Sequence, residues 1–187
     1  PRSGTSMMMQ MLVAGGMAPL TDGNREADAS NPKGYYEYDN ATQLASDTAW
    51  IGEAKGKVVK IVAQLLPWLP TDIDGAPAHY RVVFMDRNIE EVVASQRTML
   101  DRQGRTGAQL EQAHLAEIFK DQLQKVHRFI AERGIPCLGV QHAEVIHDAQ
   151  SAAEGVNRFL GGTLGGPAMA AVVDPSLHRE KVGVKET

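Results

Sequence analysis

The sequence predicts an α/β protein, in which a short parallel sheet lies between two layers of helices as a three-layer α/β/α domain. The 187 residues match the usual size of one domain, so we expect a single domain over residues 1–187. The hydrophobic content of 43% and the charged content of 22% are those of an ordinary globular chain. Short apolar runs, which are typical of buried parallel strands, alternate with helical patterns along the chain.

The first forty residues combine a polar loop, an apolar helix and a second loop. Residues 1–18 begin with a Gly-, Ser- and Thr-rich stretch, Pro1 to Ser6, and continue into an apolar stretch, Met7 to Met17. That stretch is apolar nearly all round, which indicates a helix buried against a sheet. Residues 19–40 are rich in Pro, Gly, Asn and Asp, which predicts a long loop that borders a cleft.

The middle of the chain alternates expected helices and strands. We expect a helix over Ala41–Glu53, a β-branched strand over Lys57–Val62, and a short helical turn over Leu65–Leu69. Residues Thr71–Ala78 are expected to form a loop. The apolar run Arg81–Met85 predicts a buried parallel strand.

The last third predicts three more elements. After a helix that Asp86 or Asn88 would cap, running to about Arg102, a long amphipathic helix over Gly107–Glu132 ends at Gly134. A strand over Pro136–Gln141 and a helix over Ser151–Leu160 follow. Residues 165–187 are expected to form a tail.

Charge and composition exclude several classes of function. The net charge of −4 and pI near 5.9 provide no basic field for a nucleic acid. No apolar run is long enough to span a membrane. The single cysteine, Cys137, favours a reducing, cytoplasmic location and is interpreted as a strand core residue. The six histidines show no metal-ligand spacing, so no metal is expected.

The chemistry is expected where the parallel strands end. Ligands of such sheets bind at the carboxyl edge, where the first loop, the Asp86–Arg87 turn and the Gln141–His142 turn would share one cleft. In the first loop, Gly4 lets backbone N–H groups approach an anion, while Ser3, Thr5 and Ser6 add hydroxyl donors and Arg2 adds a charge.

The first loop has a plainer interpretation. A helix-capping turn explains Ser and Thr at these positions equally well. The loop is not a Walker A motif, because the Gly-Lys-Ser/Thr ending is absent, and this disfavours a magnesium-dependent kinase.

Pro-Arg-Ser-Gly-Thr-Ser resembles the 5′-phosphosulfate loop of sulfotransferases that use 3′-phosphoadenosine 5′-phosphosulfate (PAPS), in its bacterial form. The segment from Arg87 to Ser95 matches the spacing of the Arg and Ser with which that family holds the 3′-phosphate of the donor. The segment around Lys60, followed by Leu65-Leu66-Pro67, is similar to the strand and turn that carry its catalytic lysine. Without the first loop, Arg87 is better interpreted as a surface salt-bridge partner of Glu90 or Glu91, and the plainer interpretation of Lys60 is a solvated strand-edge lysine.

Two weaker motifs extend the resemblance over nearly the whole chain. Residues 31–37, Asn-Pro-Lys-Gly-Tyr-Tyr-Glu, are similar to a loop of the bacterial members, and Phe159-Leu160-Gly161 to a late family motif. The resemblance implies a P-loop-like sulfotransferase fold and transfer of a sulfuryl group to a hydroxyl or amine of a small molecule, glycan or peptide. It implies that Arg2 and Lys60 neutralise charge during transfer, and that residues 2–6 bind the donor.

Three departures leave parts of this assignment open. Val62 stands where cytosolic members place a catalytic His, and Met7 where they place a Trp. The family also has a strand directly before the phosphate loop, and we expect that first strand to be missing from this chain. The alternatives are a nucleotide-binding protein without catalysis and a P-loop kinase of a small metabolite. The acceptor and the oligomeric state stay undetermined.

Because Val62 cannot accept a proton, another general base is needed. Glu37 is the leading candidate, since some sulfotransferases outside the cytosolic group use a Glu after the first helix. His142, His147 and Asp39 are alternative bases, and a strong alternative for Glu37 itself is a structural role as a helix cap for the segment that starts near Asn40.

Overall fold

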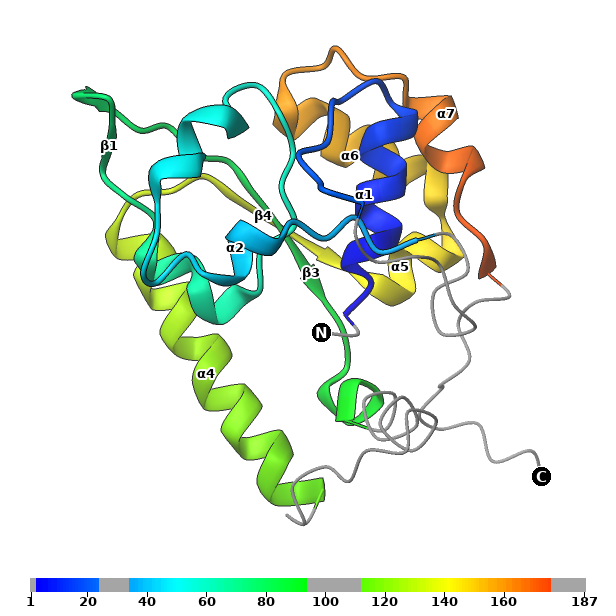
Figure 1. Ribbon diagram of the computed structural model, residues 1–187. Helices are drawn as coiled ribbons and strands as arrows, with labels where there is room; N and C mark the ends of the chain where they lie inside the picture. The colour runs from blue at the N-terminus through cyan, green and yellow to red at the C-terminus, as the bar shows by residue number, and fades with distance from the viewer. Residues whose placement is uncertain (1–2, 24–33, 94–111, 176–187) are drawn as a thin grey trace.

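The computed structural model describes residues 3–23, 34–93 and 112–175 (Figure 1). Its elements, in chain order, are α1 (Thr5–Ala14), α2 (Asp39–Thr42), the 3₁₀ helices η1 (Ala49–Ala54) and η2 (Ala63–Trp68), β1 (Asp72–Ile73), β2 (Ala76–Pro77), β3 (Val82–Asp86), α4 (Gln112–Glu132), β4 (Cys137–Gln141), α5 (His142–His147), α6 (Ala149–Leu160) and α7 (Gly166–Ala171). Within these ranges no helix is both long enough and apolar enough to cross a membrane.

A parallel pair of strands, β3 and β4, lies at the centre of the molecule (Figure 1). The pairing runs from Val82 opposite Cys137 to Asp86 opposite Gln141 without interruption. Both strands were predicted from their apolar runs, and both predictions are confirmed to within a residue. The connection between them contains α4, as parallel strands require a long crossover.

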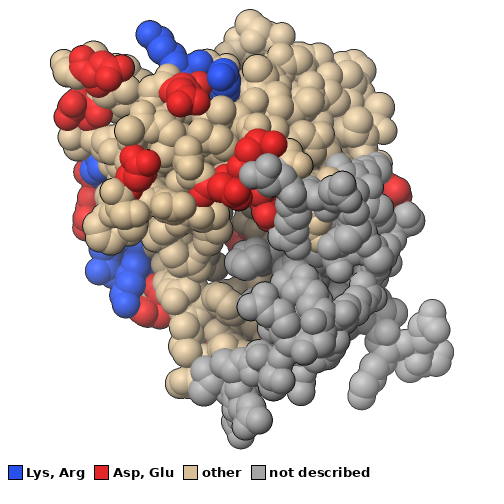
Figure 2. Space-filling view, in the orientation of Figure 1, with Lys and Arg blue, Asp and Glu red and all other residues tan. Residues whose placement is uncertain are grey.

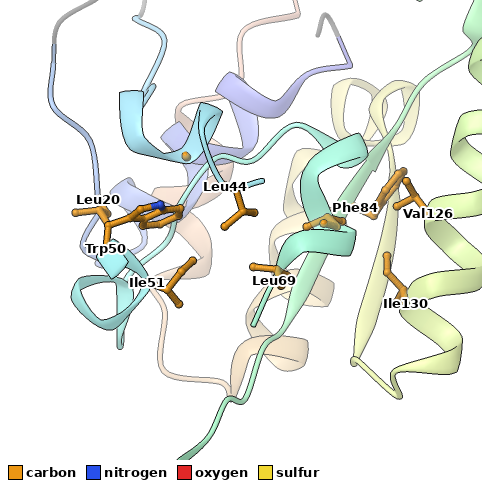
Figure 3. Close-up of a cluster of buried hydrophobic side chains, with 10 residues drawn as sticks. Leu20, Leu44, Trp50, Ile51, Leu69, Phe84, Val126 and Ile130 are labelled. Carbon is orange, nitrogen blue, oxygen red and sulfur yellow. The ribbon is translucent and has the colours of Figure 1, made fainter. Parts of the chain in front are cut away.

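Helices cover both faces of this pair. Successive side chains of a strand point to opposite faces. Phe84 therefore packs with Val126 and Ile130 of α4 in one hydrophobic cluster (Figure 3), while Met85 and Val140 pack in a second. The second cluster contains side chains of α1, α5, α6 and α7, which lie together on the other side of the strands (Figure 1). The described residues thus form a mixed α/β fold with a small parallel sheet.

The predicted helix ends are also confirmed where the structure describes them. The Asn88 side chain accepts hydrogen bonds from the N–H groups of Glu90 (2.8 Å) and Glu91 (3.3 Å), which caps a helix that begins at Ile89. Gly134 follows α4 in a left-handed conformation (φ 59°), as a helix-ending glycine does. The expected course of the capped helix to Arg102 lies outside the described residues.

The prediction of a strand over Lys57–Val62 is wrong. This segment is extended, yet it forms only one isolated parallel bridge, between Val58 and Pro19. Strand propensity describes a fit to a pleated surface, and a strand forms only where a neighbour supplies hydrogen bonds. Among the described residues, no neighbouring strand pairs with residues 59–62.

The long helix expected over Ala41–Glu53 is also wrong. The structure has a four-residue helix, α2, and the separate 3₁₀ helix η1. Polar side chains between them bond to the local backbone: Ser46 Oγ donates to Gln43 O (3.0 Å) and Asp47 Oδ1 accepts from Ala49 N–H (2.9 Å). Such bonds compete with a continuous helix.

Two segments that were expected to be irregular contain regular secondary structure. Asp74 and Gly75, both with positive φ, connect the two-residue strands β1 and β2 inside the expected loop Thr71–Ala78. The expected tail begins with helix α7, where Pro167 lies in the first turn and Met169 is fully buried against the second cluster. Proline in the first helical turn starts a helix rather than breaking it.

Candidate functional site

The Ser3–Ser6 loop leads directly into the N-terminus of α1. Gly4 is the N-cap residue, in a left-handed conformation (φ 92°), and its carbonyl accepts the first helical hydrogen bond from Met8 N–H (3.1 Å). Among the described residues, no side chain caps α1. Ser and Thr therefore do not act here as the ordinary N-cap, and the first N–H groups of the helix point towards the loop.

Gly4 lies at the carboxyl edge of the parallel strands. A Cβ atom at this position would lie 2.5 Å from His142 Cδ2 and 3.3 Å from Met85 Cε. His142 begins α5 directly after β4, and it is buried, with 7% of its surface exposed. The first loop and the Gln141–His142 turn thus meet at one edge, as the sequence predicted.

Lys60 joins the first loop to the segment before α2. Its ammonium lies 3.5 Å from Ser6 Oγ and 3.3 Å from Glu37 Oε1, and it donates a short hydrogen bond to the carbonyl of Tyr35. The Lys60 side chain is 15% exposed and that of Glu37 is 35% exposed. Lys60 is therefore a largely buried, paired cation at the first turn of α1, and the solvated strand-edge interpretation is wrong.

Several backbone contacts hold the Glu37 segment in place. The carbonyl of Glu37 accepts hydrogen bonds from Thr21 Oγ1 (2.7 Å) and from Asp22 N–H (3.3 Å). Tyr36 beside it has a positive φ of 52°, which a bulky residue rarely adopts, while the Tyr35 side chain is buried. These contacts bring the Glu37 carboxylate towards Lys60 and leave part of it open to solvent.

Arg87 lies at the end of β3, where the sequence placed it. Its Nε donates to Glu91 Oε2 at 2.9 Å, and the two side chains are only 8% and 14% exposed. This is the ion pair with Glu91 that the sequence left open, although both partners are mostly buried. Arg2 and Ser95 lie outside the described residues.

A large cavity connects these groups. It has a volume of about 1580 Å³, above the range of about 300–1,000 Å³ usual for ligand pockets, and Ser3–Ser6, Glu37, Lys60, Arg87 and His142 all line it. Figure 2 shows a hollow in one face of the molecule, with acidic side chains beside it. Ser3 to Ser6, Glu37, Lys60 and Arg87 therefore share one cavity.

The alternative bases lie in different surroundings. Asp39 begins α2, and its N–H donates to Asp22 Oδ2 (2.6 Å), whereas His147 is exposed at the far end of α5. His142 and His147 lie at the two ends of helix α5. Across residues 3–23, 34–93 and 112–175, no three His, Cys, Asp or Glu side chains gather as metal ligands would.

Cys137 fits its predicted role in the core. It lies in β4, partly buried beside the first hydrophobic cluster. Burial raises the pKa of its thiol above the ordinary value, which favours the unreactive protonated form.

Sequence reasoning missed two contacts at this site. One is the Tyr35 carbonyl, which accepts hydrogen bonds from both Lys60 and Ser6. The other is the packing of His142 on Gly4. Neither has a local sequence signal, because each joins residues far apart in the chain.

The comparisons with known proteins identified no relative: no family model, no curated protein and no solved structure matches this chain.

Proposed function

We propose that this protein is a sulfotransferase that moves a sulfuryl group from PAPS to a hydroxyl or amine acceptor. The observation that carries the proposal is the position of Lys60, whose ammonium lies within 3.5 Å of Ser6 in the first turn of α1 and within 3.3 Å of Glu37. A cation, a helix N-terminus and a carboxylate in one cavity suit the transfer of an anionic group to a nucleophile.

Each group has a role in this proposal. The N–H groups and hydroxyls of Ser3–Ser6 would hold the 5′-phosphosulfate, together with Arg2. Arg87 and Ser95 would hold the 3′-phosphate. The parallel sheet, which is covered by helices on both faces, would then be the core of a three-layer, P-loop-like sulfotransferase domain.

Transfer breaks the bond between sulfur and the bridging phosphate oxygen and forms a bond between sulfur and the acceptor oxygen or nitrogen. Negative charge develops on the leaving bisphosphate, and Lys60 and Arg2 would neutralise it. Glu37 would take the proton that the acceptor loses. The Lys60–Glu37 contact keeps both groups at one place in the cavity.

Binding of nucleotides tests the proposal most directly. Calorimetry should show that 3′,5′-bisphosphoadenosine binds at least about tenfold more tightly than AMP, because each charge-assisted hydrogen bond to the 3′-phosphate contributes roughly 1.5–3 kcal/mol. ATP with Mg²⁺ should bind weakly. Equal affinity for bisphosphoadenosine and AMP would contradict the assignment, and tight Mg²⁺-dependent binding of ATP would favour the kinase.

Arg87→Ala should remove most of the preference for the 3′-phosphate. Because this change removes the ion-pair partner Arg87 from the mostly buried Glu91 carboxylate, the double variant Arg87→Ala/Glu91→Gln keeps the fold testable. Arg81→Ala is the matched control, since Arg81 is exposed before the start of β3. If the Arg81 variant loses the preference and the Arg87 variants keep it, the 3′-phosphate is bound elsewhere.

A nucleotide-binding protein without catalysis is the second candidate. Val62 favours it, because this residue lines the cavity two positions after Lys60 and offers no proton acceptor. Tight binding of bisphosphoadenosine with no release of it from PAPS, across a panel of phenol, sugar and amine acceptors, would support this candidate.

A further inference from the structure

Strand β4 has an open outer edge within the part of the chain that the structure describes. It pairs with β3 on one side, and no described strand pairs with it on the other. Val82 N–H donates to Pro136 O (2.9 Å), so alternate residues of β4 bond to β3 along the parallel ladder. The N–H and C=O groups of Cys137 and Gly139, and the N–H group of Gln141, are therefore directed to the outer edge.

The sequence of β4 does not protect this edge. Proteins usually prevent edge strands from pairing with a lysine, a proline or a bulge. Within β4, which the structure describes in full, the sequence is Cys-Leu-Gly-Val-Gln, and the register with β3 is uninterrupted. Gly139 at its centre is exposed, and no atom lies within 4 Å of the position that a Cβ would take. A further strand can therefore approach this edge closely.

An apolar groove of about 590 Å³ runs beside the edge, on the face that α6 covers. Small and apolar residues form much of its wall, among them Leu138, Val140, Ala152, Gly155 and Val156. Leu138 and Val140 point from β4 to this face and pack with the second hydrophobic cluster. Apolar side chains of a paired strand would lie over the groove and extend that cluster.

Opposite charges lie at the two ends of the groove. Glu144 and Asp148 line it where β4 ends. Arg158 is exposed in the last turn of α6, two turns after the groove residue Ser151 and on the same side of the helix. The carbonyl of Phe159 beside it accepts a hydrogen bond from Arg81 (3.3 Å), which places this turn near the start of β3. The groove is thus acidic at one end and basic at the other.

We propose that the outer edge of β4 is a dimer interface, where β4 pairs in antiparallel orientation with β4 of a second copy about a twofold axis at Gly139. The outward-directed residues are arranged symmetrically about Gly139. In the dimer the two Gly139 residues therefore face each other as a hydrogen-bonded pair, and Cys137 faces Gln141 of the second copy. The proposal is independent of the sulfotransferase activity.

The charges fit the same axis. The rise from Cys137 to Gln141 is about 13 Å along a strand, and the rise from Asp148 to Arg158 is about 15 Å along a helix. A rotation that exchanges the ends of β4 therefore also exchanges the ends of α6. It brings Arg158 of each copy towards Glu144 and Asp148 of the other. A peptide of unrelated sequence would gain the backbone hydrogen bonds without these paired charges, so a second copy is the favoured occupant.

A cysteine on the axis tests the geometry. In a Cys137→Ser background, Gly139→Cys places two cysteines with Cα atoms about 5.5 Å apart, which is within the range of about 4.4–6.8 Å that disulfides span. Mild oxidation should therefore give a covalent dimer. Gln141→Cys in the same background is the matched control, because Gln141 is exposed on the same strand and its two copies would lie about 13 Å apart along the strand direction. It should stay uncrosslinked.

Two substitutions should weaken the dimer that light scattering measures. Gly139→Pro removes an outward N–H group, and proline is tolerated where an edge strand faces solvent, so the monomer should fold. Arg158→Glu places like charges at both ends of the interface and should raise the dimer Kd by about tenfold or more. Arg128→Glu is the control, because Arg128 is exposed on α4, on the other face of the sheet, and it should leave the Kd unchanged.

Three results would overturn the proposal. One is a monomer at every soluble concentration; slow amide exchange at Gly139 and Gln141 in that monomer would mean that the chain covers its own edge, and fast exchange would leave the edge for another protein. Another is equal crosslinking through residues 139 and 141. The third is a dimer whose Kd is unchanged by Arg158→Glu and, where the variant folds, by Gly139→Pro, because the copies would then meet through a different surface.

Discussion

The imidazole of His142 lies directly against Gly4, so that a Cβ at Gly4 would lie 2.5 Å from His142 Cδ2. Gly4 also has a φ of 92°, which side chains disfavour. The first turn of the loop is therefore fixed by two independent requirements for glycine, one in the backbone and one in the packing of α5.

Gly4→Ala should destabilise the protein and distort the loop. The left-handed conformation alone costs about 1–2 kcal/mol for a residue with a Cβ, and displacement of the buried His142 adds to this. Urea unfolding measures the change. His142→Ala in the Gly4→Ala background should restore only the part due to the clash.

Gly155→Ala is the matched control for this substitution. Gly155 lies inside α6 with ordinary φ, and no atom lies within 4 Å of a Cβ there. Alanine should leave stability unchanged or raise it by about 0.5–1 kcal/mol. Equal stability of the Gly4→Ala variant and the unaltered protein would show that the loop has another conformation.

Lys60→Ala should lower kcat by about 10²–10³-fold, with a smaller change in donor affinity. The charge that Lys60 meets develops during transfer, so its loss affects the transition state more than the bound donor. Lys57→Ala serves as the control, because Lys57 is exposed in the same segment. Normal turnover with weak donor binding would make Lys60 a binding residue only.

Glu37→Gln should lower turnover by about 10²–10⁴-fold and leave donor binding intact. Glutamine keeps the shape of the side chain, and the carbonyl of residue 37 still accepts from Thr21 and Asp22. Glu53→Gln, at an exposed site in η1, controls for the loss of one negative charge. If the Glu37→Gln variant retains kcat across the pH range, the base is one of His142, His147 and Asp39, or a group outside the described residues.

Asp148 should make the stability of the protein depend on acid pH. It caps α6, and hydrogen bonds from Ser151 lower the pKa of its carboxyl group below the ordinary value. A lowered pKa in the folded state means that the stabilisation is present above the unfolded pKa of about 3.9, and is lost as the pH falls through the folded value.

The comparison of Asp148→Asn with the unaltered protein isolates this effect. Asparagine caps a helix as well as aspartate but does not titrate. Urea midpoints should favour the unaltered protein near neutral pH and converge with those of the variant in acid. A difference that stays constant with pH would contradict the role of the charge.

Local patterns were sufficient for several parts of the fold. The apolar runs at residues 81–85 and 136–141 predicted the two paired strands, because a strand with both faces covered must be apolar throughout. Gly134 and Asn88 predicted helix ends, because left-handed φ and side-chain capping are properties of single residues. Arg87 was expected at the end of β3 because it closely follows the apolar run that predicted this strand.

Other features depended on partners that lie far away in the sequence. The segment 57–62 has the composition of a strand, but only its neighbours determine whether its backbone is paired. Helix α7 is weakly marked in sequence, and it is stabilised by burial of Met169 against α1 and α6. Helix propensity alone contributes little to so short a helix.

The sequence by itself determined which residues carry charge and which can accept a proton, and it predicted where the chain turns. Tertiary structure alone decided that Lys60 meets Glu37, Ser6 and the Tyr35 carbonyl. Local geometry follows from neighbouring residues, whereas these contacts arise when packing of the two hydrophobic clusters brings distant segments to one edge of the sheet.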